Sequence, residues 1–97
     1  MVLGQKSHTA GDTIRYLVDY TRWLDEGISL TAVTIALAPG SPADVTLSGA
    51  LLLTQHNRVA FVITGGSVNE NFTVAVQITD SRNEVKNDTC LFTVVAP

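Results

Sequence analysis

Hydrophobic and polar residues alternate with a period of two over several short segments of this chain. The clearest segment is residues 71–80, in which every second residue is apolar and the others are small or polar. The apolar positions are Phe72, Val74, Val76 and Ile78. This alternation predicts an antiparallel strand with one buried face and one partly exposed face.

Less regular alternations predict strands over most of the remaining chain. They cover residues 13–19, 30–38, 45–47, 51–54, 58–64 and 85–95. In the last of these segments we expect Cys90, Phe92 and Val94 to be buried. Turn-forming residues separate the segments, most clearly at residues 39–42, where two prolines flank a glycine and a serine. About seven short strands without a long helical pattern predict an all-β fold, a single immunoglobulin-like antiparallel β-sandwich.

Two segments do not follow the alternating pattern. Residues 1–11 are mostly polar and include Gly4 and Gly11. We therefore predict an N-terminal arm over residues 1–11, flexible or bound to a partner, and a sandwich domain over residues 12–97. Residues 20–27 lack a period of two and end at Gly27, which predicts a wide corner or a short turn of helix.

The composition limits the classes of partner. The chain of 97 residues has only 15% charged residues and a formal net charge of −3. Soluble domains contain about 25% charged residues, so part of this surface is expected to be covered by partners. The acidic balance argues against nucleic acid as a partner. The longest uncharged stretch, residues 27–43, is broken by threonine, serine, proline and glycine, so no membrane span is predicted.

No group of residues has the spacing of a catalytic, cofactor or metal site. Cys90 is the only cysteine and lies in a strand-like segment, so we interpret it as a small buried hydrophobic residue. His8 and His56 fall in the predicted arm and in a turn, where exposed polar side chains are expected. Four acidic residues lie close together in the sequence, but solvated charges or turn caps explain them better than a calcium site. They are Asp12, Asp19, Asp25 and Glu26. The sequence therefore predicts neither an enzyme nor a cofactor.

Residues 16–24 combine aromatic and aliphatic side chains with Asp19 and Arg22. Trp23 is expected to close one end of the sandwich, and Asp19 to cap the turn that follows. The alternative is that Trp23 and Arg22 belong to a docking surface, since tryptophan and arginine are enriched in binding hot spots. The candidate residues for protein contacts are His8, Arg22, Trp23, Asp25 and Glu26.

The order of several motifs resembles a family of small proteins of tailed phages and prophages, the fibre–tail adaptor or virion structural proteins with an immunoglobulin-like fold. The resemblance covers roughly residues 12–95. It begins with Tyr16, Val18, Asp19, Tyr20, Trp23, Leu24, Gly27 and Leu30, and continues with residues 61–66, 71–74, Ile78-Thr79 and 89–95. The chain departs from the family pattern at Tyr20, where tryptophan is common, and over residues 39–57.

The resemblance implies a virion component that is assembled in the host bacterial cytoplasm. Such a protein is expected to be present in several symmetric copies and to bind other phage structural proteins of the tail, neck, fibre or capsid. Two other functions remain open from the sequence. One is a decoration protein on the capsid, and the other is a carbohydrate-binding or adhesin-like module. The second would need exposed aromatic residues and a secretion signal, neither of which the sequence suggests.

Overall fold

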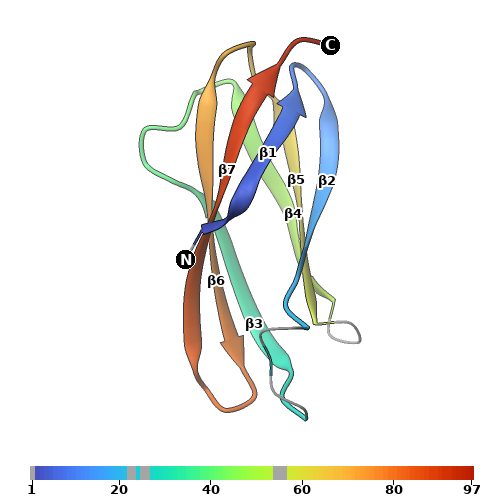
Figure 1. Cartoon of the computed structure of the whole chain (residues 1–97), viewed down its shortest axis with the longest axis vertical. Coiled ribbons are helices and arrows are strands. Elements are labelled where there is room, and N and C mark those ends of the chain that lie inside the picture. Colours follow the sequence, from blue (N-terminus) through green and yellow to red (C-terminus); the bar gives the residue numbers. More distant parts are fainter. Residues whose placement is uncertain (1, 22–23, 25–26, 54–56) are drawn as a thin grey trace.

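Seven strands form two sheets that pack face to face in an elongated sandwich (Figure 1). The computed structural model describes residues 2–21, 24, 27–53 and 57–97. The strands are β1 (Val2–Thr9), β2 (Thr13–Asp19), β3 (Leu30–Leu37), β4 (Val45–Leu53), β5 (Arg58–Gly65), β6 (Asn71–Asp80) and β7 (Val85–Val95). This architecture confirms the predicted all-β sandwich.

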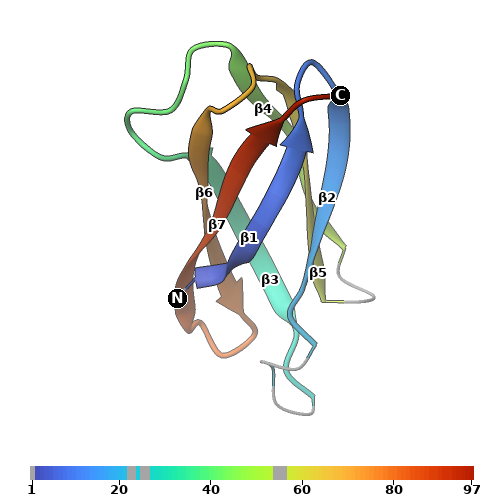
Figure 2. The same ribbon diagram turned by 45° about the horizontal axis from the view of Figure 1, so that its top comes forward.

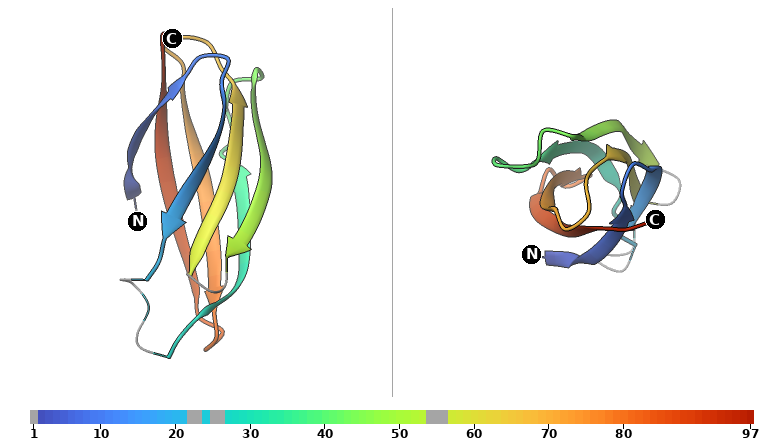
Figure 3. Two further views of the ribbon diagram at one scale, coloured as in Figure 1. Left: turned by 90° about the vertical axis from the view of Figure 1, so that its right-hand side faces the viewer. Right: turned by 90° about the horizontal axis from the view of Figure 1, so that it is seen from above.

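One sheet has the strand order β1-β7-β6-β3 and the other has the order β2-β5-β4. Figure 3 shows the two layers from the side and from above. Four of the five strand pairings are antiparallel, whereas β1 runs parallel to β7, as Figures 1 and 2 show. The prediction of an antiparallel sandwich is therefore correct except at this one pairing. An immunoglobulin domain of the constant type is likewise built from a four-stranded and a three-stranded sheet packed face to face.

Five of the predicted strands lie where the alternating pattern placed them, with ends that differ by at most one residue, and the others need correction. Residues 45–47 and 51–54 were expected to form two strands, but β4 is one strand over Val45–Leu53. Its pairing with β5 shifts between Ser48 and Leu51. One extra residue is inserted there, because Gly49 and Ala50 together lie opposite Phe61. Gly49 has a φ of 64°, which favours glycine, and the bulge interrupts the alternation that the sequence analysis relied on.

A flexible or partner-bound arm was predicted for residues 1–11, but residues 2–9 form strand β1. Seven residues of β1 are in register with β7, from Val2 opposite Thr89 to Thr9 opposite Val95. The backbone N–H of Ala10 donates a further hydrogen bond of 2.9 Å to the carbonyl of Val95. The polar sequence of this strand reflects its position at the edge of the sheet, where most side chains reach solvent.

The core is centred on aromatic rings from both sheets. Phe72 and Phe92 are directly opposite each other on β6 and β7, and their rings stack with centroids 4.9 Å apart. Tyr16 packs edge-on against Phe92 at 4.9 Å, and Phe61 does so at 6.2 Å. Cys90, Phe92 and Val94 are each 1% exposed, which confirms the burial predicted for β7. These rings join the two sheets across the middle of the sandwich.

The predicted corner over residues 20–27 lies partly outside the described residues. The backbone N–H of Leu24 donates to the carbonyl of Tyr20 at 3.1 Å. Gly27 has a φ of 81°, a conformation that glycine adopts without strain. The chain then enters β3 at Leu30, which is buried.

Candidate interaction surfaces

Four of the five residues predicted to make protein contacts lie outside the described residues. They are Arg22, Trp23, Asp25 and Glu26. The fifth, His8, was expected to be exposed, but it is fully buried between the sheets. His8 therefore cannot contribute its side chain to a surface, and the expected exposure is wrong.

The ring of His8 joins β1 to the start of β2 and the end of β5. Its Nε2 lies 3.2 Å from the carbonyl oxygen of Asp12 and 3.1 Å from that of Gly65. Because both partners are acceptors, Nε2 carries the proton, and Nδ1 is 2.8 Å from the hydroxyl of Tyr16. His8 thus has a structural role and fixes the edge strand β1 to the other sheet.

Asp19 ends β2 in the way predicted for a turn cap. Its Oδ1 accepts hydrogen bonds from the backbone N–H of Thr21 at 2.8 Å and from the hydroxyl of Thr21 at 2.6 Å. These bonds lower the pKa of Asp19 below its ordinary value. Arg58, directly opposite on β5, adds an ion pair of 3.5 Å between exposed groups. Asp19 therefore acts as a cap, and among the described residues no group of three or more His, Cys, Asp and Glu is placed to hold a metal ion.

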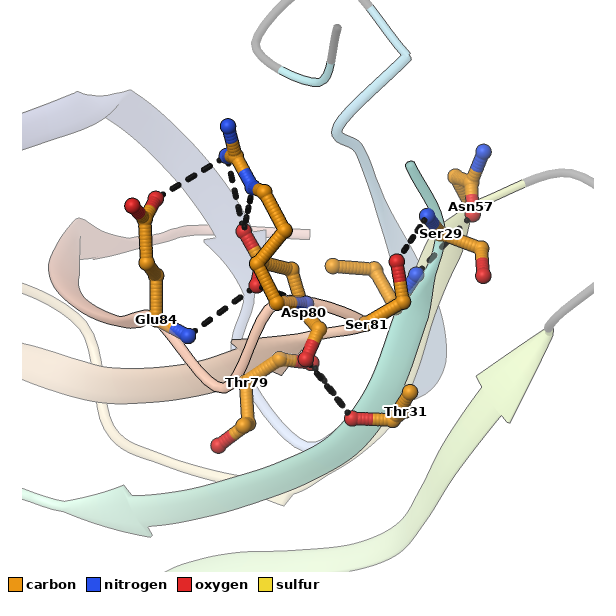
Figure 4. Close-up of polar contacts among 9 residues, drawn as sticks. Ser29, Thr31, Asn57, Thr79, Asp80, Ser81 and Glu84 are labelled. Carbon is orange, nitrogen blue, oxygen red and sulfur yellow. Dashed lines mark hydrogen bonds and ion pairs between the residues drawn. The ribbon is translucent and has the colours of Figure 1, made fainter. Parts of the chain in front are cut away.

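The buried carboxylate of Asp80 organises the β6–β7 hairpin at the end of the sandwich (Figure 4). Oδ1 of Asp80 accepts from the backbone N–H groups of Arg82 and Glu84 at 2.8 and 3.0 Å. Its Oδ2 is 2.9 Å from Nη2 of Arg82, which also contacts Glu84. Thr31 on β3 donates to the backbone carbonyl of Asp80 at 3.2 Å. This network ties the hairpin to the edge strand β3.

The ionisation of Asp80 contributes to stability at neutral pH. Burial alone would raise the pKa of Asp80, but the hydrogen bonds from Arg82 and Glu84 outweigh it, so the pKa lies below its ordinary value. The stabilisation is therefore present above the unfolded-state pKa, about 3.9, and is lost as the pH falls below it. We expect Asp80→Asn to lower the melting temperature by about 5–10 °C at pH 7 and by much less at pH 3.

Thermal unfolding followed by circular dichroism at the two pH values measures this difference. Glu84→Gln is the matched control, because Glu84 contacts the same arginine from a side chain that is 62% exposed. Glu84→Gln should lower the melting temperature by less than a third of the decrease that Asp80→Asn causes at pH 7. Equal losses for Asp80→Asn at pH 7 and pH 3 would show that the charge of Asp80 does not contribute.

A third buried polar group, Asp88, lies on the inner side of β7. Its Oδ2 accepts a 2.9 Å hydrogen bond from the hydroxyl of Tyr20, and its Oδ1 is 3.1 Å from Nζ of Lys86. Burial and this bond to Asp88 raise the pKa of Tyr20, so its hydroxyl remains protonated and acts as a donor. Tyr20 therefore belongs to the core and is held by a specific partner, which leaves it unable to reach a ligand at the surface.

The outer face of the β2-β5-β4 sheet presents an apolar row. Leu17, Ala60 and Leu51 are in register across the three strands. Leu17 and Leu51 are each 48% exposed, and between them Ala60 is almost completely covered. Val62 borders the row on one side, and the Asp19–Arg58 ion pair borders it on the other. An exposed apolar centre with a charged border is typical of a small protein-binding surface. We refer to it as the Leu17–Leu51 row.

The outer face of the β1-β7-β6-β3 sheet differs from this surface in its charge. Each outward position in the described part of the chain carries an uncharged side chain. These positions are Gln5, Ser7, Thr9, Ala32, Thr34, Ala36, Asn71, Thr73, Ala75, Gln77, Thr79, Val85, Asn87, Thr89, Leu91, Thr93 and Val95. We call this surface the uncharged face. It contains a shallow depression of about 330 Å³ with Ala36 and Ala75 among its lining residues.

Neither surface was identified from the sequence. In the sequence, the alternation of Ile14, Tyr16 and Val18 marks the inner side of this strand, so nothing distinguishes Leu17 on its outer side. The row becomes visible only when the register places Leu17 and Leu51 on either side of Ala60. The low charge of the chain was noted, but composition does not locate the uncharged residues on one face. Among the described residues no helix is long and apolar enough to cross a membrane.

Comparison with known proteins identifies a family that matches nearly the whole chain. The model of the family described as "Podophage GP4 fiber-tail adaptor protein gp77" matches residues 8–93. No curated protein matches the sequence. Among solved structures, the chain is similar to part of a 2,6-sialyltransferase of Vibrionaceae Photobacterium sp. JT-ISH-224, in a ternary complex with CMP and lactose. The TM-score is 0.59 at 13% identity, and the match covers 100% of this chain but 18% of that chain. At such low identity the similarity concerns the fold alone.

Proposed function

Because the chain belongs to the family of podophage GP4 fiber-tail adaptor protein gp77, we propose that it is a non-enzymatic structural protein of a tailed-phage virion that joins tail and fibre components. The observation that carries this proposal is the family match over residues 8–93, which covers both sheets except for residues 2–7 of β1 and the last two residues of β7. Several copies arranged around the tail axis would each make the same contacts. Assembly in the cytoplasm of the host bacterium belongs to the same proposal.

The shape of the molecule supports an adaptor role. The sandwich extends 42 Å along its long axis and about half of that across it. Its interior is held by aromatic packing and by buried, bonded polar groups, so it can hold two surfaces at a fixed separation. A rigid body loses little conformational freedom when it binds, which favours repeated contacts of modest area.

The Leu17–Leu51 row is the surface that we assign to contact with another tail protein. Its two leucines lie on opposite sides of Ala60, one on each neighbouring strand, so a partner side chain could cover all three residues at once. Arg15, Asp19 and Arg58 surround the row and would fix the orientation of a partner by charge. An interface with an apolar centre and a charged rim needs only a small area when it is repeated around a symmetric particle.

The amount of this chain in purified virions tests the proposed location. Quantitative mass spectrometry against the major capsid protein should give a few to a few tens of copies for each particle, as expected for a protein arranged around one axis. Hundreds of copies would instead indicate a decoration protein of the capsid. Absence from the particle would contradict a role in the virion altogether.

Charge introduced into the Leu17–Leu51 row should block incorporation. We expect Leu17→Glu combined with Leu51→Glu to reduce the amount of this chain in particles at least tenfold in a complementation assay, because two charges would be buried without partners. Stability should change by less than about 1 kcal/mol, since both side chains are half exposed. Thr46→Glu, on the same face at the far end of β4, is the matched control. Normal incorporation of the double variant would rule out the row as a contact surface.

A further inference from the structure

We propose that the uncharged face binds the same face of a second copy of this chain. The face is the outer side of the β1-β7-β6-β3 sheet, opposite the Leu17–Leu51 row across the thickness of the sandwich. This association concerns the isolated protein in solution. It is therefore independent of the proposed role in the tail.

The distribution of charge is the first argument. The sequence contains 15 charged residues, nine acidic and six basic. A protein surface carries roughly 25–35% charged residues, so a face that covers four strands would be expected to contain several. The charged residues of this sheet instead point inward, lie at its edge or lie in the hairpin. Lys86 and Asp88 point inward opposite Ile78 and Val76, and Lys6 is exposed at the edge strand β1, on the side opposite to the uncharged face. Their exclusion from one whole face indicates that this face is dehydrated in a complex.

The chemistry of the face identifies the kind of partner. A charged partner would bury its own charges against a surface that offers no opposite charge, which is costly. An uncharged partner avoids this cost, and the same face of another copy is such a surface. Hydroxyl and amide side chains both donate and accept hydrogen bonds, as Gln77 does when it donates to Asn87 at 3.1 Å. A surface made of such groups is complementary to itself under a two-fold axis.

The net charge of the protein favours this face over the others. Each copy carries a formal charge of −3, so two copies repel each other in most orientations. Contact through the uncharged face keeps the Leu17–Leu51 row and its charged border, on the other sheet, away from the interface. The small residues Ala36 and Ala75 leave a depression that allows the two sheets to approach closely.

The area of the face sets the strength of the association. Ten residues of β6 at 3.4 Å each and four strands about 4.8 Å apart give roughly 500 Å² for each copy. Stable complexes bury about 800 Å² for each partner, so this dimer is expected to be weak and to form at micromolar or higher concentration. Other contacts that bring copies together would strengthen it by raising their effective concentration.

Charge substitutions at Thr73 test the proposal by sedimentation equilibrium. Thr73 is an outward residue of β6, an inner strand of the sheet, and lies opposite Leu91 on β7. Thr73→Glu and Thr73→Lys should each weaken self-association at least tenfold, because like charges then meet across the two-fold axis. An equimolar mixture of the two variants should associate again, since opposite charges now face each other. This recovery is specific to a contact between copies.

Thr64→Glu and Thr64→Lys are the matched controls. Thr64 is also a half-exposed threonine on a central strand, β5, but it lies on the outer face of the other sheet. These variants should associate as the wild type does, and circular dichroism should show that all four variants fold. The proposal is overturned if the wild-type protein is monomeric at millimolar concentration. It is equally overturned if the mixture of Thr73 variants stays monomeric, or if the Thr64 variants lose association to the same extent.

Discussion

Replacing Phe92 with alanine is expected to lower the free energy of unfolding by about 3–5 kcal/mol. Phe92 is 1% exposed and contacts aromatic rings from both sheets, with Phe72 on its own sheet and Tyr16 and Phe61 on the other. Alanine would remove these contacts and leave a cavity that two rigid sheets cannot close. Since domains of this size are stable by about 5–15 kcal/mol, this loss is a large part of the total.

Urea unfolding followed by circular dichroism measures this effect as a lower midpoint. Leu91→Ala is the matched control, because Leu91 directly precedes Phe92 in β7 and points to the opposite side of the sheet. It should cost less than about 1 kcal/mol. Comparable losses for the two variants would show that the aromatic rings are not the centre of the core.

Removing residues 1–11 is expected to destabilise the domain by at least about 4 kcal/mol, because several backbone hydrogen bonds of about 1 kcal/mol each are lost together with a buried side chain. The truncation removes the seven paired residues of β1 and exposes the edge of β7. It also removes His8, which leaves the hydroxyl of Tyr16 and the carbonyl of Gly65 without this partner. An arm that only binds a partner would have no such effect.

The truncated chain and the point variant His8→Ala, compared by urea unfolding, separate the two contributions. His8→Ala alone should cost about 1–3 kcal/mol, through the buried groups that lose a partner. The truncated chain should unfold at a much lower urea concentration than this variant. A truncated chain with the wild-type midpoint would support the division into an arm and a domain beginning at residue 12.

The sequence predicted those strands whose inner side is apolar. Residues 71–80 alternate cleanly, because β6 packs one face on the core along nearly its full length. In residues 85–95 the apolar alternation covers Cys90, Phe92 and Val94, whereas the inner side of β7 carries Lys86 and Asp88 nearer its start. Strand β1 was missed for the opposite reason. Its inward side carries Lys6 and His8, so no apolar period marks it. His8 is buried because three polar groups surround its ring, and that arrangement arises only when distant segments meet.

The candidate surfaces could not be predicted because they depend on register between strands. The sequence shows Leu17, Ala60 and Leu51 as unrelated residues, and only the pairing of three strands brings them together. The bulge at Gly49 also shifts the alternation in β4, so the outward position of Leu51 could not be read from its neighbours. The roles proposed for Arg22, Trp23, Asp25 and Glu26 stay predictions, since these residues lie outside the described part of the chain.

The parallel pairing of β1 and β7 has a mechanical consequence. A load applied between the start of β1 and the end of β7 pulls the two strands in opposite directions along their length. The hydrogen bonds between the strands, from Val2 opposite Thr89 to Thr9 opposite Val95, then resist the load together in shear. An antiparallel hairpin pulled at its open ends breaks one bond at a time instead. Tension between the two ends of the chain therefore has to break this set of hydrogen bonds together before the two strands separate.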